Sequence, residues 1–262
     1  MSAEAVQEFT NLRNDESIQI VLNGKKFWVV EGDLLVSEAE LFAYARRRVT
    51  RPQESIEERS RLVVEVDEEQ RIKRWSPGFI ISFAVLRDTF PSANKYQIVV
   101  DSILRAVNDW ESICGVKFDY LPELDDGQFA AAERPTFTVQ WLTQIKKFLA
   151  LSFFPDWAVE DRNLLIFDKF FTDGFYEPEG IMRHELGHVL GFRHEHIRSG
   201  APADCPNEKT ANTFNFGEYD PGSVMHYFCG GVGTQEMSFS EDDRIWAKTI
   251  YGPPHHTMHY YE

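Results

Sequence analysis

Three histidines and a glutamate stand at a spacing that can build a metal site. His184, Glu185, His188 and His194 lie in the segment IMRHELGHVLGFRHEH. Successive helical residues are rotated by about 100°, so His184 and His188 lie only about 40° apart and their imidazoles converge. As an alternative, three buried core histidines would each need a separate hydrogen-bond partner. The spacing therefore favours a shared metal ion.

The helix that carries these histidines must pack an apolar side against a core, and it must end before His194. Met182, Leu186 and Val189 lie about 150–180° around the helix from the histidines, which predicts that they face a core. Gly191 predicts the end of the helix, because glycine readily adopts the left-handed conformation that reverses the chain. This reversal lets His194 return as a third ligand. Three neutral imidazoles and a water are the donor set of an open, catalytic zinc site.

A second motif, SVMHY at 223–227, contains Met225. Together with the long histidine motif it resembles the metzincin metallopeptidases, in which a methionine lies beneath the zinc site. Among these the chain looks most like the astacin family. That family reads Gly-Phe-x-His-Glu through its third histidine, as Gly191 to Glu195 do here. A weaker similarity extends over residues 75–252.

The resemblance implies a function and a role for each site residue. One catalytic Zn²⁺ ion would be bound by His184, His188 and His194, and Tyr227 would be a further ligand that turns to steady the oxyanion. Zinc lowers the pKa of a bound water to about 7, and Glu185 would accept its proton as the general base. The implied activity is that of a zinc-dependent endopeptidase on a protein or peptide substrate.

Two other functions stay open at this point. One is a catalytically silent zinc-fold binding or regulatory module, and the other is a zinc hydrolase that acts on non-peptide amides. The presence of Glu185 favours an enzyme over a silent module, because a pure scaffold does not need that carboxylate beside the metal.

The expected fold is of the α+β class. The resemblance implies a metzincin (zincin) fold, with a twisted mixed β-sheet, an active-site helix, a C-terminal helix, and zinc in the cleft between two lobes. Alternating and continuous apolar patterns predict strands at 17–22, 25–30, 79–85, 116–120, 137–141, 149–154 and 164–167. Helical spacing and capping residues predict helices at 37–48, 94–113, 178–190 and 240–251.

The expected organisation has three parts. Residues 1–74 form an N-terminal region, interpreted as an inhibitory prosegment, residues 75–252 form the catalytic domain, and residues 253–262 form a tail. The charged stretch at about 45–61 is interpreted as a solvated linker. Its alternative reading is an exposed basic cleavage site near 48–51.

The N-terminal region carries one more candidate ligand. The segment VEGDL at 30–34 resembles the Phe-x-Gly-Asp stretch of astacin prosegments, whose aspartate occupies the zinc. The resemblance therefore implies that Asp33 ligates the metal in a latent form. The simpler alternative is that Gly32 and Asp33 only make the turn between a strand and a helix.

Composition limits the partners. The 262 residues include 42 acidic and 27 basic side chains, a net charge of −15, which argues against binding to nucleic acid or to an anionic membrane. No apolar run approaches a membrane span, and the N-terminus lacks the pattern of a signal peptide. The family resemblance implies secretion, whereas a native terminus would imply a cytoplasmic protein. A monomer is assumed.

The three cysteines are too few for a disulfide scaffold. Cys205 and Cys229 could pair across the loop that leads to the second motif, although spacing alone does not decide this. Cys114 ends a predicted helix and is expected to be buried.

Overall fold

The computed structural model describes residues 2–50, 60–66, 71–143, 147–198, 200–206 and 213–255. Its α-helices are α1 (Ala3–Asn14), α2 (Glu38–Thr50), α3 (Ala93–Ile113), α4 (Asp168–Thr172), α5 (Pro178–Val189) and α6 (Glu241–Tyr251). Its strands are β1 (Gln19–Leu22), β2 (Lys25–Val30), β3 (Leu34–Val36), β4 (Ser60–Glu65), β5 (Ile80–Val85), β6 (Lys117–Tyr120), β7 (Phe137–Trp141), β8 (Ala150–Leu151), β9 (Asn163–Ile166), β10 (Phe192–Arg193) and β11 (Thr213–Gly217). Within the described residues, none of the helices combines the length and the apolar character needed to cross a bilayer.

The largest sheet has five strands in the order β6-β5-β7-β9-β8. Strand β5 is parallel to β6 and β7, and β7 is parallel to β9, whereas β8 runs antiparallel to β9. The sheet is therefore mixed, and the α+β class is confirmed. Every residue of β9 is buried, which explains the apolar run that follows Asn163.

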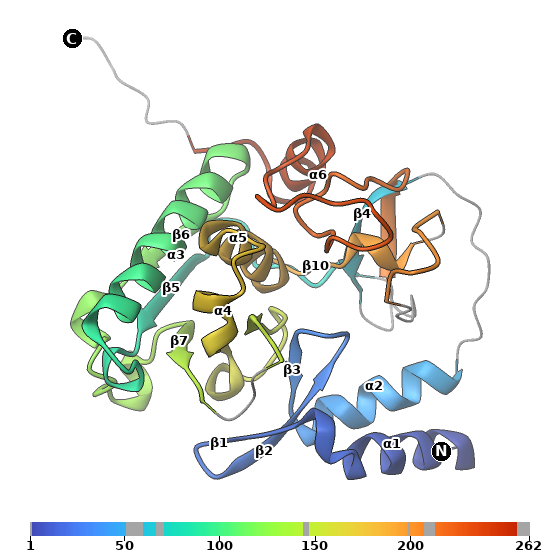
Figure 1. The fold of residues 1–262 in the computed structure, drawn as a ribbon, viewed down its shortest axis with the longest axis horizontal. Helices are drawn as coiled ribbons and strands as arrows, with labels where there is room; N and C mark the ends of the chain where they lie inside the picture. Colours follow the sequence, from blue (N-terminus) through green and yellow to red (C-terminus); the bar gives the residue numbers. More distant parts are fainter. Residues whose placement is uncertain are drawn as a thin grey trace.

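Helices α3 and α5 pack against each other beside this sheet (Figure 1). The predicted helix at 94–113 is confirmed as α3, which begins after the N-cap Ser92. Its core side is the one that the spacing predicted, since Val99, Ile103 and Trp110 are buried. The indole of Trp110 donates to the carbonyl oxygen of Arg183 at 2.9 Å, which fixes α3 against α5.

The N-terminal part forms its own layer. Helices α1 and α2 lie side by side, and the β2–β3 hairpin rises from them toward α5 and β10 (Figure 1). The predicted β1–β2 hairpin is confirmed, with Asn23 and Gly24 at positive φ as a two-residue turn requires. Helix α1 was not predicted, because most of its side chains are exposed and it shows no strong apolar period.

Strand β8 is shorter than the strand expected at 149–154. Ser152 turns its backbone to the β2–β3 hairpin instead of to β9. Its N–H donates to the carbonyl oxygen of Asp33 at 2.8 Å, and its carbonyl oxygen accepts from Leu35 N at 3.0 Å. The N-terminal region therefore adds backbone pairing at the edge of the large sheet.

A third sheet has the order β10-β4-β11, with β4 antiparallel to both neighbours. Val63 and Val64 of β4 are buried in the core. Strand β4 precedes residue 74, yet it pairs with two strands that lie between α5 and the second motif in the chain. Residues 51–59 of the expected linker and the tail beyond 255 lie outside the described residues, and the division at 74 stays a prediction.

Helix α6 and a disulfide complete this side of the molecule. The predicted capping box is present, because Ser240 and Asp243 each accept a hydrogen bond from the other's backbone N–H. A disulfide joins Cys205 to Cys229, the pairing that the sequence left open, and Cys114 is buried as expected.

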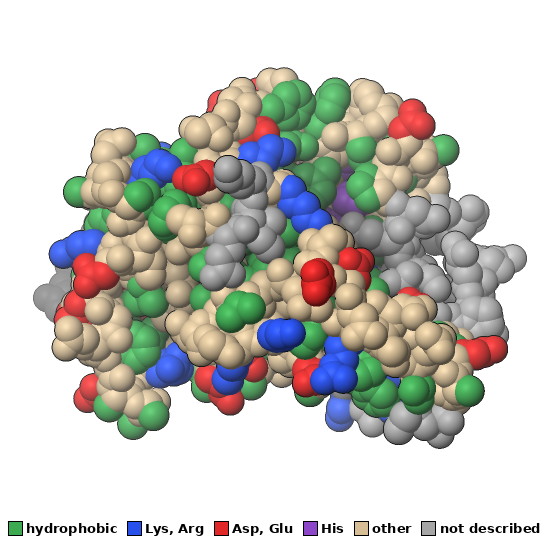
Figure 2. All heavy atoms as spheres, turned by 60° about the horizontal axis from the view of Figure 1, so that its bottom comes forward, with side chains coloured by type: hydrophobic (Ala, Val, Ile, Leu, Met, Phe, Trp, Pro, Cys, Tyr) green, Lys and Arg blue, Asp and Glu red, His purple; other side chains and the backbone are tan. Residues whose placement is uncertain are grey.

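On the described part of the face in Figure 2, acidic and basic side chains are interspersed and neither sign forms a broad patch.

Candidate metal centre

Helix α5 positions the first two histidines and Glu185. Pro178 occupies its first turn, where a missing N–H costs nothing. Met182, Leu186 and Val189 are fully buried, so the apolar side of the helix packs as predicted. On the other side, the ring centroids of His184 and His188 lie 5.0 Å apart.

A reversal at Gly191 brings the third histidine to the same point. Gly191 has φ 93°, and a Cβ atom there would lie 2.2 Å from the carbonyl oxygen of Lys73. The turn therefore needs glycine for its conformation and for its space. After the short strand β10, the Nε2 atom of His194 lies 3.3 Å from that of His188.

Backbone carbonyls fix the orientation of two of the rings. His184 Nδ1 lies 2.9 Å from the carbonyl oxygen of Val224, and His188 Nδ1 lies 2.8 Å from that of Phe192. A carbonyl only accepts, so both Nδ1 atoms carry the proton and both Nε2 atoms present a lone pair. Burial lowers the pKa of His184 to about 4, so its ring is neutral at pH 7, the form that binds a metal.

Asp33 reaches these histidines from the tip of the β2–β3 hairpin. Its Oδ2 atom lies 2.8 Å from His194 Nε2 and 3.3 Å from His184 Nε2, and its Oδ1 atom lies 3.5 Å from His188 Nε2. Burial disfavours the charged carboxylate, yet the facing imidazoles hold the pKa of Asp33 well below its usual range. Glu31 and Gly32 have positive φ values, which turn the tip sharply enough to present Asp33.

A buried ion pair holds the same hairpin tip. Arg193 Nε donates to Glu31 Oε2 at 3.1 Å, and Arg193 Nη2 contacts Glu31 Oε1. Arg193 directly precedes His194, and Glu31 lies two residues before Asp33. The hairpin tip is therefore held by two contacts, that of Asp33 with the histidines and that of Glu31 with Arg193. This pair could not be predicted from the sequence, because no spacing rule connects residues so distant in the chain.

The second motif forms the floor of the site. Met225 is fully buried and lies against Gly187, where a Cβ atom would come within 2.3 Å of its sulfur. The carbonyl oxygen of Met225 accepts from Glu195 N at 2.9 Å. The Asp243 carboxylate accepts from Val224 N at 2.8 Å, which ties this turn to α6.

Tyr227 and Glu185 complete the group. The Tyr227 hydroxyl donates to Asp33 Oδ2, and its ring centroid lies 4.6 Å from that of His184. Glu185 is buried, and among the described residues its Oε2 atom has no hydrogen-bond partner. Burial and the charge of Asp33 raise the pKa of Glu185 well above its usual value, and burial likewise raises that of Tyr227. A raised pKa makes a carboxylate a stronger base, which suits proton transfer.

The donor set fits a metal ion. One ligand atom from each of Asp33, His184, His188 and His194 lies within 4.8 Å of the others, and all four residues are buried. In the described part of the chain, Asp33 Oδ1 is a buried oxygen without a hydrogen bond. Such an atom is costly unless a cation or a donor satisfies it. The structure thus brings together every predicted site residue, including Tyr227 and Asp33.

Comparisons with known proteins give partial matches. No family model matches the chain. It is 38% identical over 86 residues to zinc metalloproteinase nas-3 of Caenorhabditis elegans, covering 29% of this chain and 30% of that protein. It is 46% identical over 63 residues to an astacin-like metalloendopeptidase of Gallus gallus, covering 19% of this chain and 15% of that protein. The match thus spans less than a third of either relative's length.

Among solved structures, the chain is similar to myroilysin, with a TM-score of 0.49, 18% sequence identity, and coverage of 72% of this chain and 98% of that one. The curated relatives are the stronger finding, since their identities are higher over the segments that they match. They confirm the recognition drawn from the two motifs: this chain resembles the metzincin zinc metallopeptidases, most of all the astacin-like ones.

Proposed function

We propose that this chain is a zinc-dependent endopeptidase that Asp33 holds in a latent form. The observation that carries the proposal is the convergence of three histidines on one point, with Glu185 beside them and Asp33 opposite. The names of the relatives, zinc metalloproteinase and metalloendopeptidase, support the same activity.

His184, His188 and His194 would hold the ion through their Nε2 atoms. Zinc, when bound, lowers the pKa of water to about 7 and polarises a substrate carbonyl. Glu185 accepts a proton from the attacking water and returns it to the leaving amine, a task that suits a buried carboxyl with a raised pKa. The Tyr227 hydroxyl, which now donates to Asp33, donates instead to the developing oxyanion.

The hairpin tip would block this site in the full chain. Asp33 takes the position that the substrate and the water need, and the Glu31–Arg193 pair keeps the tip in place. Its backbone pairing with Ser152 covers the edge of β8, where an extended peptide would otherwise pair. We include in the proposal that residues 1–74 act as a prosegment, and that its displacement starts activity outside the cell.

The test compares Glu185→Gln with its parent, both carrying Asp33→Ala, on casein and with zinc content measured. We expect both proteins to bind one zinc ion, and only the parent to cleave. The loss of a general base predicts a decrease of about 10²–10⁴-fold in kcat. A chelator should abolish the remaining cleavage.

Two outcomes would contradict the proposal. If zinc is bound but neither the Asp33→Ala chain nor an N-terminally trimmed chain cleaves peptides, the protein is a silent zinc-fold module. If a non-peptide amide is hydrolysed and casein is not, mass analysis of the products identifies the other hydrolase.

A further inference from the structure

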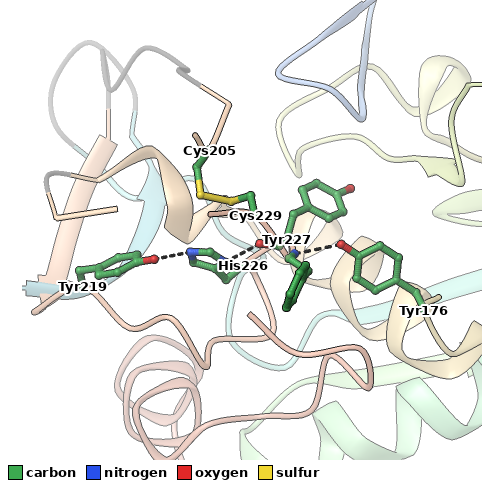
Figure 3. The surroundings of a disulfide bond; sticks show 7 residues. Tyr176, Cys205, Tyr219, His226, Tyr227 and Cys229 are labelled. Atoms are coloured by element: carbon green, nitrogen blue, oxygen red, sulfur yellow. Dashed lines mark hydrogen bonds between the residues drawn. A yellow bond between two sulfur atoms is a disulfide. The ribbon is translucent and has the colours of Figure 1, made fainter. Parts of the chain in front are cut away.

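The peptide unit between Tyr227 and Phe228 is held from both sides (Figure 3). Its carbonyl oxygen, that of Tyr227, lies 2.6 Å from His226 Nδ1. Its N–H, that of Phe228, donates to the Tyr176 hydroxyl at 2.9 Å. A single peptide plane thus has both of its polar groups bound by side chains, one from the turn itself and one from the segment before α5.

His226 is itself oriented by a third residue. Tyr219 Oη lies 2.6 Å from His226 Nε2 (Figure 3). Because the Tyr227 carbonyl can only accept, His226 Nδ1 carries the proton. In the neutral ring, Nε2 then accepts from the Tyr219 hydroxyl. The order of donation is Tyr219 to His226 to the Tyr227 carbonyl.

Tyr176 approaches from the opposite side. It lies between α4 and α5, so it comes from the segment that leads directly into the helix of His184. Its ring centroid lies 6.2 Å from that of Tyr227, and the neighbouring Phe175 packs on Phe228 at 5.2 Å. The Cys205–Cys229 disulfide then fixes the residue that follows Phe228.

This arrangement has a consequence for the phenol of Tyr227. The orientation of the peptide plane sets ψ of Tyr227 and φ of Phe228, and these angles control how the Tyr227 side chain leaves the backbone. The plane is neither in a helix nor in a strand, so no regular backbone pairing would hold it. Side chains hold the peptide plane instead: His226 bonds to its carbonyl oxygen and Tyr176 to its N–H.

We propose that Tyr176 is a positioning residue, which acts with His226 and Tyr219 to aim the Tyr227 hydroxyl at the metal centre. The inference rests on the proposed function, in which Tyr227 donates to the oxyanion. The role assigned to Tyr176 runs through the peptide unit that carries Tyr227, whose N–H donates to its hydroxyl. No motif marks it, since its partner is a backbone N–H 52 residues along the chain.

The test is a double-mutant cycle between Tyr176→Phe and Tyr227→Phe in the Asp33→Ala chain. Tyr176→Phe removes one hydroxyl and keeps the ring. We expect kcat to fall roughly fivefold, the factor that corresponds to one neutral hydrogen bond, while KM stays within about twofold. In the Tyr227→Phe background the same change should have no effect on kcat. Tyr120→Phe is the control and should not change kcat, because it also removes one hydroxyl but on β6, at the opposite edge of the five-stranded sheet from β8.

A second readout does not depend on proteolysis. With Cu²⁺ bound in place of zinc, a coordinated tyrosine gives a visible charge-transfer band, which Tyr227→Phe should abolish and Tyr176→Phe should shift or weaken. The positioning role is overturned if Tyr176→Phe leaves kcat and the band unchanged, or lowers kcat equally in both backgrounds. If no Glu185-dependent cleavage exists, the proposed function fails, and the copper spectrum still decides the role of Tyr176.

Discussion

The Oδ2 atom of Asp33 lies 2.8 Å from the Nε2 atom of His194, although 161 residues separate them in the chain. The same carboxylate faces His184 and His188, so one acidic side chain lies against all three imidazoles. We predict that Asp33→Ala opens the metal centre. Glu185-dependent cleavage of casein by the full chain should rise on the order of 100-fold. This is the lower end of the gain in affinity that tethering commonly gives a ligand.

The matched control for this prediction is Glu31→Gln at the same hairpin tip. It weakens the contact with Arg193 but leaves the carboxylate of Asp33 in place. A smaller rise in activity is therefore expected than for Asp33→Ala. Equal activity of Asp33→Ala and the unaltered chain, at equal zinc content, would show that Asp33 makes only a turn.

A second prediction concerns the contact between Gly187 and Met225. A Cβ atom at 187 would lie 2.3 Å from Met225 Sδ and 3.1 Å from its Cε. Gly187→Ala gains about 1 kcal/mol of helix propensity, whereas overpacking in a rigid core costs about 1–3 kcal/mol. Because Met225 is fully buried, we expect net destabilisation and weaker zinc binding.

Urea unfolding and zinc titration measure these two effects. Met225→Ala creates space for the new methyl group, so it should cost less stability in the Gly187→Ala chain than in the unaltered chain. A gain of stability in Gly187→Ala, as propensity alone predicts, would show that the methionine moves freely.

Local patterns explain why much of the site could be predicted. The convergence of His184 and His188 follows from helical geometry alone, and the reversal at Gly191 follows from glycine's conformational freedom. Helix α3 and the β1–β2 hairpin likewise have caps, turns and periods within a short stretch of sequence. Residues close together in the chain specify these elements, so a single sequence is enough to predict them.

The missed features depend on long-range pairing. Strand β4 begins where a charged stretch ends, and its buried valines gain partners only when β10 and β11 assemble around it. Strand β8 ends early because Ser152 bonds to the β2–β3 hairpin. The Glu31–Arg193 pair and the Tyr176 contact also join distant segments, and no periodicity in the sequence specifies such contacts.

A third prediction concerns the disulfide between Cys205 and Cys229. It closes a loop with a sequence separation of 24. In the chain-entropy model, closing such a loop stabilises the fold by about 3 kcal/mol. Changing both cysteines to serine should therefore lower Tm by roughly 6–12 °C.

Thiol titration checks the pairing directly. Burial raises the pKa of the Cys114 thiol to about 12, so the native protein should not react at pH 8. One thiol should appear in denaturant, and two more after reduction. Three reactive thiols in denaturant without a reductant would contradict the disulfide.

The last prediction is a pH dependence of stability from Asp243. Burial raises the pKa of this carboxyl to about 6, against 3.8 for the free group, although its bonds to Val224, Ser223 and Ser240 oppose the shift. Below pH 4 both states are protonated. Between pH 4 and 6 only the folded state keeps the proton, so rising pH favours unfolding.

The expected size follows from a shift of about two units, which corresponds to about 3 kcal/mol. The stability of the unaltered chain relative to Asp243→Asn should therefore fall by about that amount between pH 4 and pH 7, because asparagine does not titrate. Urea unfolding of chelator-treated protein at several pH values measures the difference, and metal binding then does not enter. Glu241→Gln, in the exposed first turn of α6, is the control. A difference that stays constant with pH would mean that Asp243 is ionised throughout, and that its three hydrogen bonds outweigh its burial.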